Sequence, residues 1–164
     1  MDAYKAIVSK RDSRSYVDKP LDEGALRRIL QAGRMAGSSK NTQPCRFVVV
    51  REPEQKARLA GCGQFAQHVP QAAAAVAVCL PPTGGDFDAG RAAQNIMLAA
   101  WNEGVASCPV SMHDRDCARS VLGLPEDWRV AVVLALGYPA PGIPLGRGIQ
   151  RLSLEEFVRY ERWE

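Results

Sequence analysis

The chain has 164 residues, 46% of them apolar and 24% charged, which is enough apolar material to bury an ordinary core in one domain over residues 1–164. Its 21 basic and 18 acidic residues leave a net charge of +3, too small for the broad cationic face that nucleic-acid-binding proteins present. No run approaches the ~20 apolar residues that a membrane span needs, so neither nucleic acid nor a membrane is expected as a partner.

The predicted elements alternate between amphipathic helices and short apolar strands. After a first helix that ends before Lys10, helices are expected over residues 22–36, 53–60, 88–103 and 114–122, and strands over 46–51, 73–80 and 130–136, with a shorter strand-like piece ending at Val110. A last helix is expected after Ser153, which stands three residues before Glu156 in the spacing of a capping box. Helices interspersed with a few buried strands predict an α/β or α+β sandwich.

The helix expected at residues 88–103 is apolar nearly all round. One stripe runs through Ala93 and Ile96, but Leu98 and Trp101 extend the apolar character well beyond it. Such a helix is either buried on all sides or shared with another subunit.

The number and placement of the cysteines indicate the cellular compartment in which the protein works. Five is an odd number for a disulfide framework, and Cys79 stands within an apolar strand, where a free thiol packs as a small hydrophobe. The N-terminal residues also lack the basic start and apolar stretch of a signal peptide. These features predict a cytoplasmic protein in a reducing compartment.

The first candidate site is a cluster of cations after the first helix. Lys10, Arg11 and Arg14 fall within five residues, a density suited to charge-assisted hydrogen bonds with a phosphate or another anion. The alternative is a solvated helix end.

Two further polar segments could contact a ligand. Residues 37–44 connect a helix to a strand and contain several small hydroxyl and amide side chains, whose exposed donors could form hydrogen bonds with a polar heterocycle. Residues 109–112 follow a core strand and could aim backbone N–H groups at a ligand. Each segment also has a purely structural interpretation: residues 37–44 as a connecting loop, and residues 109–112 as the end of a strand.

Other chemistries have little support. Cys108, His113 and Cys117 could in principle bind zinc, but there is no C-x-x-C pair and no fourth ligand. No G-x-S-x-G elbow is present, and the two histidines, His68 and His113, are expected to be surface or loop residues. The absence of G-x-G-x-x-G and Walker sequences disfavours the usual nucleotide folds.

Five segments taken in order carry a family resemblance. They are K-R-D-S-R-S-Y at 10–16 with K-P-L at 19–21, S-S-K-N-T-Q-P at 38–44, D-A-G at 88–90 with A-Q-N at 93–95 and L-A-A at 98–100, L-G-Y-P at 136–139, and R-L-S-L-E-E at 151–156. Over almost its whole length the chain resembles the FMN-dependent nitroreductase family. The resemblance implies an α+β sandwich with a central mixed or mostly antiparallel sheet flanked by helices, working as an intertwined homodimer with two FMN sites at the interface.

The resemblance also implies the cofactor contacts. The FMN phosphate and ribityl would be held by cations near both ends of the chain, namely Lys10, Arg11, Arg14, Arg147 and Arg151. The partner subunit would contribute the loop residues Ser38, Ser39 and Asn41. The flavin face would be covered by Pro109, Val110, Ser111 and Met112, with a backbone N–H of Ser111 or Met112 donating to flavin N5. Gln64 would touch the pyrimidine edge.

The sequence departs from the family pattern at several positions. The first motif, commonly Arg-x-Ser-x-Arg, begins here with Lys10 and has Asp12 in the middle. Ser111-Met112 stands where a Glu-Gly pair is frequent. The chain is also short between Leu80 and Asp88, where longer members have a helical excursion over the pocket, so a more open substrate pocket is expected.

The implied activity is transfer of a hydride from NADH or NADPH through flavin N5 to a nitroaromatic, quinone or similar flat conjugated acceptor, by a ping-pong mechanism. No catalytic side chain and no metal are required, because the flavin carries the chemistry. Two alternatives remain: a non-catalytic flavin-binding or regulatory module, and a different flavin reaction, such as dehydrogenation or dehalogenation, on the same scaffold.

Overall fold

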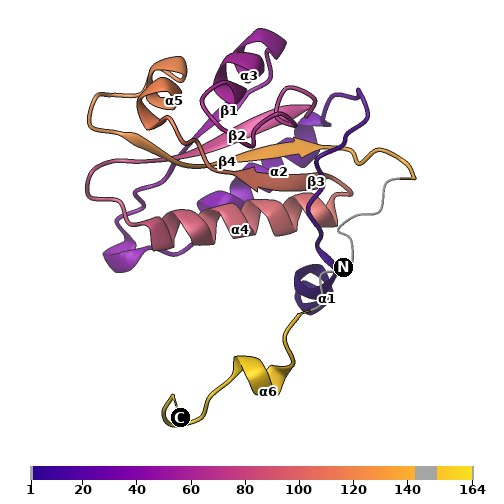
Figure 1. Cartoon of the computed structure of the whole chain (residues 1–164), viewed down its shortest axis with the longest axis vertical. Coiled ribbons are helices and arrows are strands. Elements are labelled where there is room, and N and C mark those ends of the chain that lie inside the picture. The colour runs from indigo at the N-terminus through magenta and orange to yellow at the C-terminus, as the bar shows by residue number, and fades with distance from the viewer. Residues whose placement is uncertain (1, 143–150, 164) are drawn as a thin grey trace.

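The computed structural model describes residues 2–142 and 151–163 (Figure 1). In chain order the elements are α1 (Ala3–Ser9), α2 (Glu23–Arg34), the short 3-10 helix η1 (Ser39–Asn41), β1 (Arg46–Val50), α3 (Pro53–Ala60), β2 (Ala74–Leu80), α4 (Asp86–Asn102), β3 (Ala106–Val110), α5 (Arg115–Val121), β4 (Arg129–Gly137) and α6 (Leu154–Phe157). Every helix and strand expected from the sequence is present, and α4 begins two residues earlier than predicted.

Aspartates begin several of these helices. The side chains of Asp2, Asp22 and Asp114 precede α1, α2 and α5, and each accepts a hydrogen bond from the backbone N–H three residues later, at 2.8, 2.8 and 2.9 Å. A carboxylate at this position satisfies an N–H that has no partner within the helix and lies at the positive end of the helix dipole. Local sequence therefore sets where these helices begin.

The strands form one antiparallel sheet in the order β1-β2-β4-β3. This confirms the α+β class, and each described strand pair is antiparallel rather than mixed. β3 lies at one edge of the sheet and contains Pro109, which lacks a backbone N–H and is tolerated at an edge strand.

Helices cover both faces of the sheet (Figure 1). Along β2, Val76 and Val78 pack with residues of α2 and α4, whereas Ala75 and Ala77 pack on the opposite face with residues of α3 and α5. Successive strand residues point to opposite faces, so a strand covered on both must be apolar throughout. This is why the sequence of β2 shows an unbroken apolar run instead of alternation.

Helix α4 is buried along one side only. Ile96 and Ala100 are fully buried against the sheet and α2, whereas Leu98 and Trp101 are only partly buried and the Phe87 side chain is 78% exposed. A single chain therefore does not enclose α4 on all sides. The sequence allowed two explanations, burial of this helix on all sides within one chain or contact with another subunit. Contact with another subunit is the explanation that remains, and it stays a prediction.

The C-terminal helix stands away from the sandwich. Figure 1 shows α1 near the C-terminal end of α4, which it contacts through the Trp101–Ser9 hydrogen bond, and α6 farther from the sheet, with the C-terminus farthest. The predicted capping box at α6 is confirmed, since Ser153 and Glu156 exchange side chain to backbone hydrogen bonds. The large apolar side chains Phe157, Tyr160 and Trp163 are all more than three-quarters exposed, so they lack cover within one chain.

Two of the five cysteines are joined. A disulfide links Cys62 to Cys117, which the odd cysteine count did not indicate, while Cys79 is free and buried as expected. Burial raises the pKa of the Cys79 thiol to about 11. Because Cys117 is oxidised it cannot ligate zinc, and no three metal-binding side chains gather anywhere in residues 2–142 and 151–163.

A search of the described helices for a membrane span gives a negative result: none combines the necessary length with enough apolar character.

Candidate functional site

Residues 10–17, here called the N-terminal strap, run along the free edge of β3. The backbone N–H of Ser13 donates to the carbonyl of Ser107 at 3.0 Å, and that of Val17 donates to the carbonyl of Tyr138 at 3.0 Å. Strand-like pairing therefore fixes the predicted cations at this edge of the sheet, although the sequence gives no strand signal there.

Tyr16 anchors the strap. Its hydroxyl donates to the carbonyl of Ser13, and its ring lies so close to Gly137 that a Cβ there would stand 2.8 Å from the ring carbon Cδ1. Burial is the largest of the causes that raise the pKa of Tyr16, so the phenol stays protonated. Tyr16 is thus a buried hydrogen-bond donor that positions the backbone.

The three cations of the strap differ in availability. The Lys10 ammonium forms an ion pair with the Asp12 carboxylate, and the Lys10 side chain is only 11% exposed. The Arg11 guanidinium donates to the carbonyls of Val8 and Lys10, both at 2.9 Å. Arg14 is exposed and makes no hydrogen bond or ion pair with any residue in the described part of the chain. Arg14 is therefore the cation best placed to bind an anion.

The loop between α3 and β2, residues 61–72, packs directly on the end of β3. A Cβ on Gly63 would lie 3.1 Å from Met112 Cε and 3.2 Å from the Ser111 carbonyl oxygen, so only glycine permits this approach without displacement. The backbone N–H of Asp114 donates to the carbonyl of Cys62 at 3.0 Å. Two segments more than 40 residues apart in sequence are thus held together.

Gln64, expected at a flavin edge, lies in this contact. Its backbone N–H donates to His113 Nδ1 at 3.2 Å, and the Phe65 ring meets the His113 ring edge-on, with centroids 5.7 Å apart. A cavity of about 710 Å³ opens here, lined by residues 61–64 and 113–116. The Phe65 side chain is 69% exposed and presents a flat apolar surface.

Arg14 connects the strap to these segments. Burial is the main cause that raises the pKa of the Cys108 thiol in β3 and lowers the pKa of His68 in the 61–72 loop, and the positive charge of Arg14 acts on both side chains as a smaller cause. The structure therefore brings together Arg14, the loop that carries Gln64, and the strand that ends in Ser111 and Met112.

His68 lies in a loop, as expected, but it is not a surface residue. Its side chain is buried, the ring interacts with the backbone of Phe65, and Nε2 has no hydrogen-bond partner within the described residues. Burial first, and the charge of Arg14 second, lower the pKa of His68. No spacing or motif in the sequence distinguishes this histidine, which is why it was not among the candidate residues.

The second predicted segment lies elsewhere. Gly37 faces the guanidinium of Arg91 in the first part of α4, whereas the strap contacts the later residues Met97 and Trp101, the latter through its neighbour Ser9. Met97 lies six residues after Arg91, about 9 Å along the helix axis, and Trp101 lies about 15 Å along it. Among the described residues, no hydrogen bond or ion pair joins the 38–41 loop to the strap.

The 38–41 loop has a defined shape of its own. The Ser38 hydroxyl accepts a hydrogen bond from the Gln43 backbone N–H at 2.8 Å, and Lys40 and Asn41 adopt positive φ angles of 51° and 54°. Ser39 and Asn41 are exposed. The loop offers polar side chains to something outside this chain.

Of the two C-terminal arginines, Arg151 is exposed, precedes α6 and makes no hydrogen bond or ion pair with the described residues, whereas Arg147 lies outside the described residues. Their expected role toward a phosphate stays a prediction.

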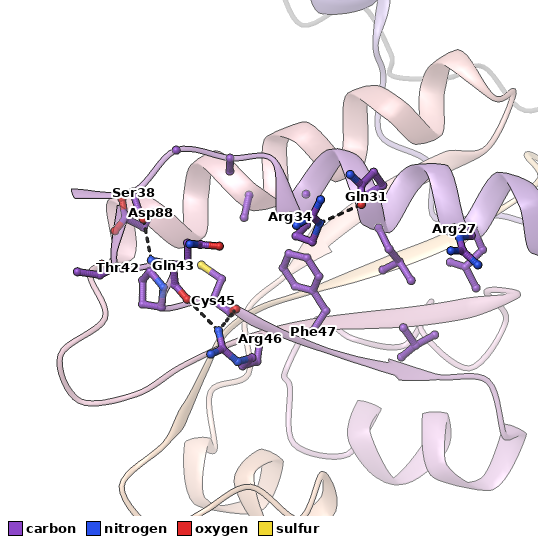
Figure 2. A pocket seen from close by; sticks show the side chains of 18 of the residues that line it. Arg27, Gln31, Arg34, Ser38, Thr42, Gln43, Cys45, Arg46, Phe47 and Asp88 are labelled. Atoms are coloured by element: carbon purple, nitrogen blue, oxygen red, sulfur yellow. Dashed lines mark hydrogen bonds between the residues drawn. The ribbon is translucent and has the colours of Figure 1, made fainter. Parts of the chain in front are cut away.

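A second cavity, here called the α2–β1 cavity, has a volume of about 810 Å³ (Figure 2). Two of its arginines are held in place by neighbours: Arg34 donates to Gln31 Oε1 at 2.9 Å, and Arg46 donates to the carbonyl of Gln43 at 2.8 Å. Among the predicted site residues only Ser38 lines it. This cavity is therefore not where the strap, the 61–72 loop and β3 converge.

Known proteins resemble this chain in both sequence and fold. The model of the Nitroreductase family matches residues 7–79 and 81–138. A protein of Archaeoglobus fulgidus, described as "Putative NADH dehydrogenase/NAD(P)H nitroreductase", is 33% identical over 170 residues, covering 97% of each protein. The NADPH-flavin oxidoreductase of Vibrio harveyi is 28% identical over 96% of this chain and 79% of its own length.

A solved structure confirms the predicted fold. The NADPH:FMN oxidoreductase of Vibrio harveyi, complexed with NAD+, matches with a TM-score of 0.88 at 24% identity, over 98% of this chain and 77% of that one. Since the family model covers most of the sequence and the Archaeoglobus relative is similar over nearly its whole length, the chain belongs to the nitroreductase family.

Proposed function

We propose that the protein transfers a hydride from NADH or NADPH, through FMN, to a flat conjugated acceptor such as a nitroaromatic or a quinone, in a ping-pong cycle. It is an NAD(P)H-dependent oxidoreductase of the nitroreductase family with FMN as its cofactor, in keeping with the flavin oxidoreductases it resembles. The observation that carries the proposal is the convergence of Arg14, the 61–72 loop and the end of β3 at one edge of the sheet.

The residues at this edge fit part of an FMN molecule. Arg14 provides a guanidinium with no protein partner among the described residues, and its planar fork suits phosphate oxygens. Gly63 keeps the loop close to β3, and the buried Nε2 of His68 has no hydrogen-bond partner in residues 2–142 and 151–163. When bound, FMN supplies the hydride transfer at its N5.

The chain's own residues bind and orient the cofactor. Arg14 holds the phosphate and ribityl, with Lys10 and Arg11 adding positive charge beside it. The backbone at Ser111 and Met112, just beyond the last residue of β3, donates toward N5, and Gln64 borders the pyrimidine edge. No side chain of the strap is needed as a general acid or base, since Tyr16 stays protonated and its hydroxyl is already paired.

The site is completed by a second copy of the chain. The separation along α4 between the 38–41 loop, at Arg91, and the strap's contact at Met97, about 9 Å along the helix axis, supports Ser38, Ser39 and Asn41 serving the partner's flavin rather than their own. The exposed apolar residues of the C-terminal arm also need cover. The α2–β1 cavity, rimmed by arginines beside the edge strand β1, suits an arm that carries acidic and aromatic residues. The protein is therefore proposed to work as an intertwined homodimer, each chain one domain.

The acceptor pocket is open. Only residues 81–85 join β2 to α4, too few for a helix that could cover the flavin. The exposed ring of Phe65, backed by His113, offers a surface on which a flat acceptor can stack.

The test is a spectrum followed by a titration. The purified protein should be yellow, and anaerobic NADH or NADPH should bleach the visible flavin band, which a quinone or nitroaromatic then restores. Parallel initial-rate lines in double-reciprocal plots support the ping-pong cycle. A protein that binds FMN but is not bleached is the flavin-binding module instead, and a bleached protein that no quinone or nitroaromatic reoxidises performs a different flavin reaction.

A further inference from the structure

A disulfide joins the two segments that line the cavity beside the proposed flavin site. Cys62 follows the last residue of α3 by two positions, and Cys117 lies in the first turn of α5, so the bond links the end of one helix to the start of another. The cavity of about 710 Å³ is lined by residues 61–64 and 113–116, and Cys62 is one of them. The disulfide therefore belongs to the wall of this cavity.

The noncovalent contacts between these two segments gather within four residues of the disulfide. The backbone N–H of Asp114 donates to the carbonyl of Cys62 at 3.0 Å, and that of Gln64 donates to His113 Nδ1 at 3.2 Å. The Phe65 ring meets the His113 ring edge-on. Contacts of this kind each contribute modestly to stability, whereas a covalent bond fixes the separation of its two ends. The disulfide thus governs how firmly the 61–65 segment is held.

The residues held by the disulfide include those proposed to contact the flavin. Gln64, proposed at the pyrimidine edge, lies two residues after Cys62. A Cβ on Gly63 would lie 3.1 Å from Met112 Cε, so the same loop packs on the backbone proposed to donate toward N5. A flavin that contacts both segments needs them in one arrangement. If the loop is released, binding must first order it again, and the apparent affinity falls accordingly.

The fold around the disulfide has other supports. Helix α5 begins at its own cap, where the Asp114 side chain accepts a hydrogen bond from the Cys117 backbone N–H at 2.9 Å. The Gln55 side-chain amide of α3 donates to the carbonyl of Val121 in α5 at 2.5 Å. Cys62 is also packed in the hydrophobic core. Opening the disulfide therefore releases the loop while both helices stay in place.

We propose that Cys62 and Cys117 are a redox-active pair, opened by a dithiol and closed again by a disulfide, that sets how tightly the protein holds FMN. The part of this proposal that concerns FMN rests on the proposed function. The reduced state is already accommodated, because Cys62 Sγ lies 3.6 Å from the carbonyl oxygen of Arg58, which can accept a hydrogen bond from a thiol at that position.

The opening is an ordinary thiol–disulfide exchange. A thiolate of the dithiol attacks Sγ of Cys117, the more exposed of the two residues, and the bond between Cys62 and Cys117 breaks. Cys62 leaves as a thiolate and takes a proton from water. The second thiol of the dithiol loses its proton, attacks the mixed disulfide and releases Cys117, which is protonated in turn. The pair gains two electrons and two protons, and the dithiol is oxidised to a disulfide.

The first measurement asks whether a dithiol opens the pair in the folded protein. The full chain is treated with dithiothreitol in the absence of denaturant, quenched in acid, unfolded and alkylated, and its mass gives the number of thiols. Untreated protein should carry three alkyl groups, on the free cysteines Cys45, Cys79 and Cys108, and treated protein should carry five. The circular dichroism spectrum before the quench should be unchanged.

The second measurement reports on the loop without any flavin. Relaxation of the backbone amides by ¹⁵N NMR is compared for the oxidised and reduced forms of the flavin-free protein. On reduction residues 63–66 should become mobile, whereas α2, which lies on the other face of the sheet, should stay rigid. This readout concerns the folded state alone, so a general loss of stability does not produce it.

The third measurement is the affinity for FMN in both redox states. Reduction should raise the dissociation constant about tenfold, because binding must then order the loop, and reoxidation with oxidised glutathione should restore it. A variant with both Cys62→Ser and Cys117→Ser should bind like the reduced wild type and ignore dithiothreitol, which controls for any effect of the reagent on the flavin. Cys45→Ser keeps the disulfide and should respond to dithiothreitol as the wild type does.

Three results would overturn the proposal. A pair that dithiothreitol opens only after the protein is unfolded in urea is a structural link. A fully reduced protein whose 63–66 segment stays rigid, or one that binds FMN as tightly as the oxidised form, shows that the disulfide does not control the site. Oxidised wild type that takes up no FMN overturns the proposed function and the role of the pair in flavin binding, a result that the thiol count and the relaxation data distinguish from a pair that does not open.

Discussion

Arg14→Ala should separate flavin binding from folding more cleanly than any other substitution in the strap. The guanidinium is exposed and has no partner among the described residues, so its loss should change the free energy of unfolding by no more than about 0.5 kcal/mol. A hydrogen bond to a charged group contributes about 1.5–3 kcal/mol. The dissociation constant for FMN should therefore rise about 10- to 150-fold.

The measurement is a fluorescence titration of FMN with flavin-free protein, repeated at two salt concentrations. Arg14→Lys keeps the charge but not the planar fork and should fall between wild type and alanine. Arg58→Ala is the matched control, because Arg58 is an exposed arginine of α3 that lies outside both the strap and the α2–β1 cavity. Riboflavin, which keeps the ribityl chain but has no phosphate, should show a smaller difference in affinity between wild type and Arg14→Ala than FMN does.

Two results would refute this reasoning. If Arg14→Ala retains FMN after extensive dialysis as well as wild type, the strap does not hold the phosphate. If Arg58→Ala weakens FMN binding as much as Arg14→Ala, the loss reflects the net charge of the protein rather than a phosphate contact at the strap.

Three further predictions concern stability. Replacing both Cys62 and Cys117 by serine removes a disulfide between residues 55 positions apart, and on the chain-entropy model it should lower the free energy of unfolding by about 4 kcal/mol. In urea unfolding, dithiothreitol should lower the midpoint of the wild type toward that of the variant and leave the midpoint of the variant unchanged. Gly137→Ala places a Cβ 2.8 Å from the Tyr16 ring and should cost about 1–3 kcal/mol, a penalty that calorimetry should find absent in the Tyr16→Ala background. Since the folded pKa of His68 lies below its ordinary 6.5, the folded state binds fewer protons than the unfolded one, and the stability of the flavin-free protein should fall as the pH drops below about 6.5. His68→Leu should flatten that part of the pH profile, and an equally steep profile for the variant would contradict the assignment.

The sequence predicted the elements well because their signals are local. The apolar run of β2, the helical spacing of α2 and the Ser153/Glu156 capping pair each depend on residues within a few positions of one another. The order of the motifs along the chain also identified the family, which the comparisons confirmed. The boundaries differ by one or two residues, mainly at the ends of helices, where the last turn depends on neighbours.

The sequence predicted which residues form the strap's group of cations, but not which of these cations is free to bind a ligand. Lys10, Arg11 and Arg14 look alike in the sequence, yet the fold pairs Lys10 with a carboxylate, turns Arg11 onto backbone carbonyls and leaves Arg14 available. The difference arises because strap residues pair with β3, a contact between segments about 95 positions apart. The burial of His68 escaped notice for the same reason.

By itself the sequence determined the helices and strands, since hydrophobic periodicity and capping act between near neighbours, and the order of its motifs determined the family and, through it, the α+β class. Only the tertiary structure decided which cation is available, which histidine is buried, which cysteines are joined, and that the 38–41 loop lies away from the strap. These are properties of residues far apart in the chain, and they exist only once the sheet and its two helical layers have brought those residues together.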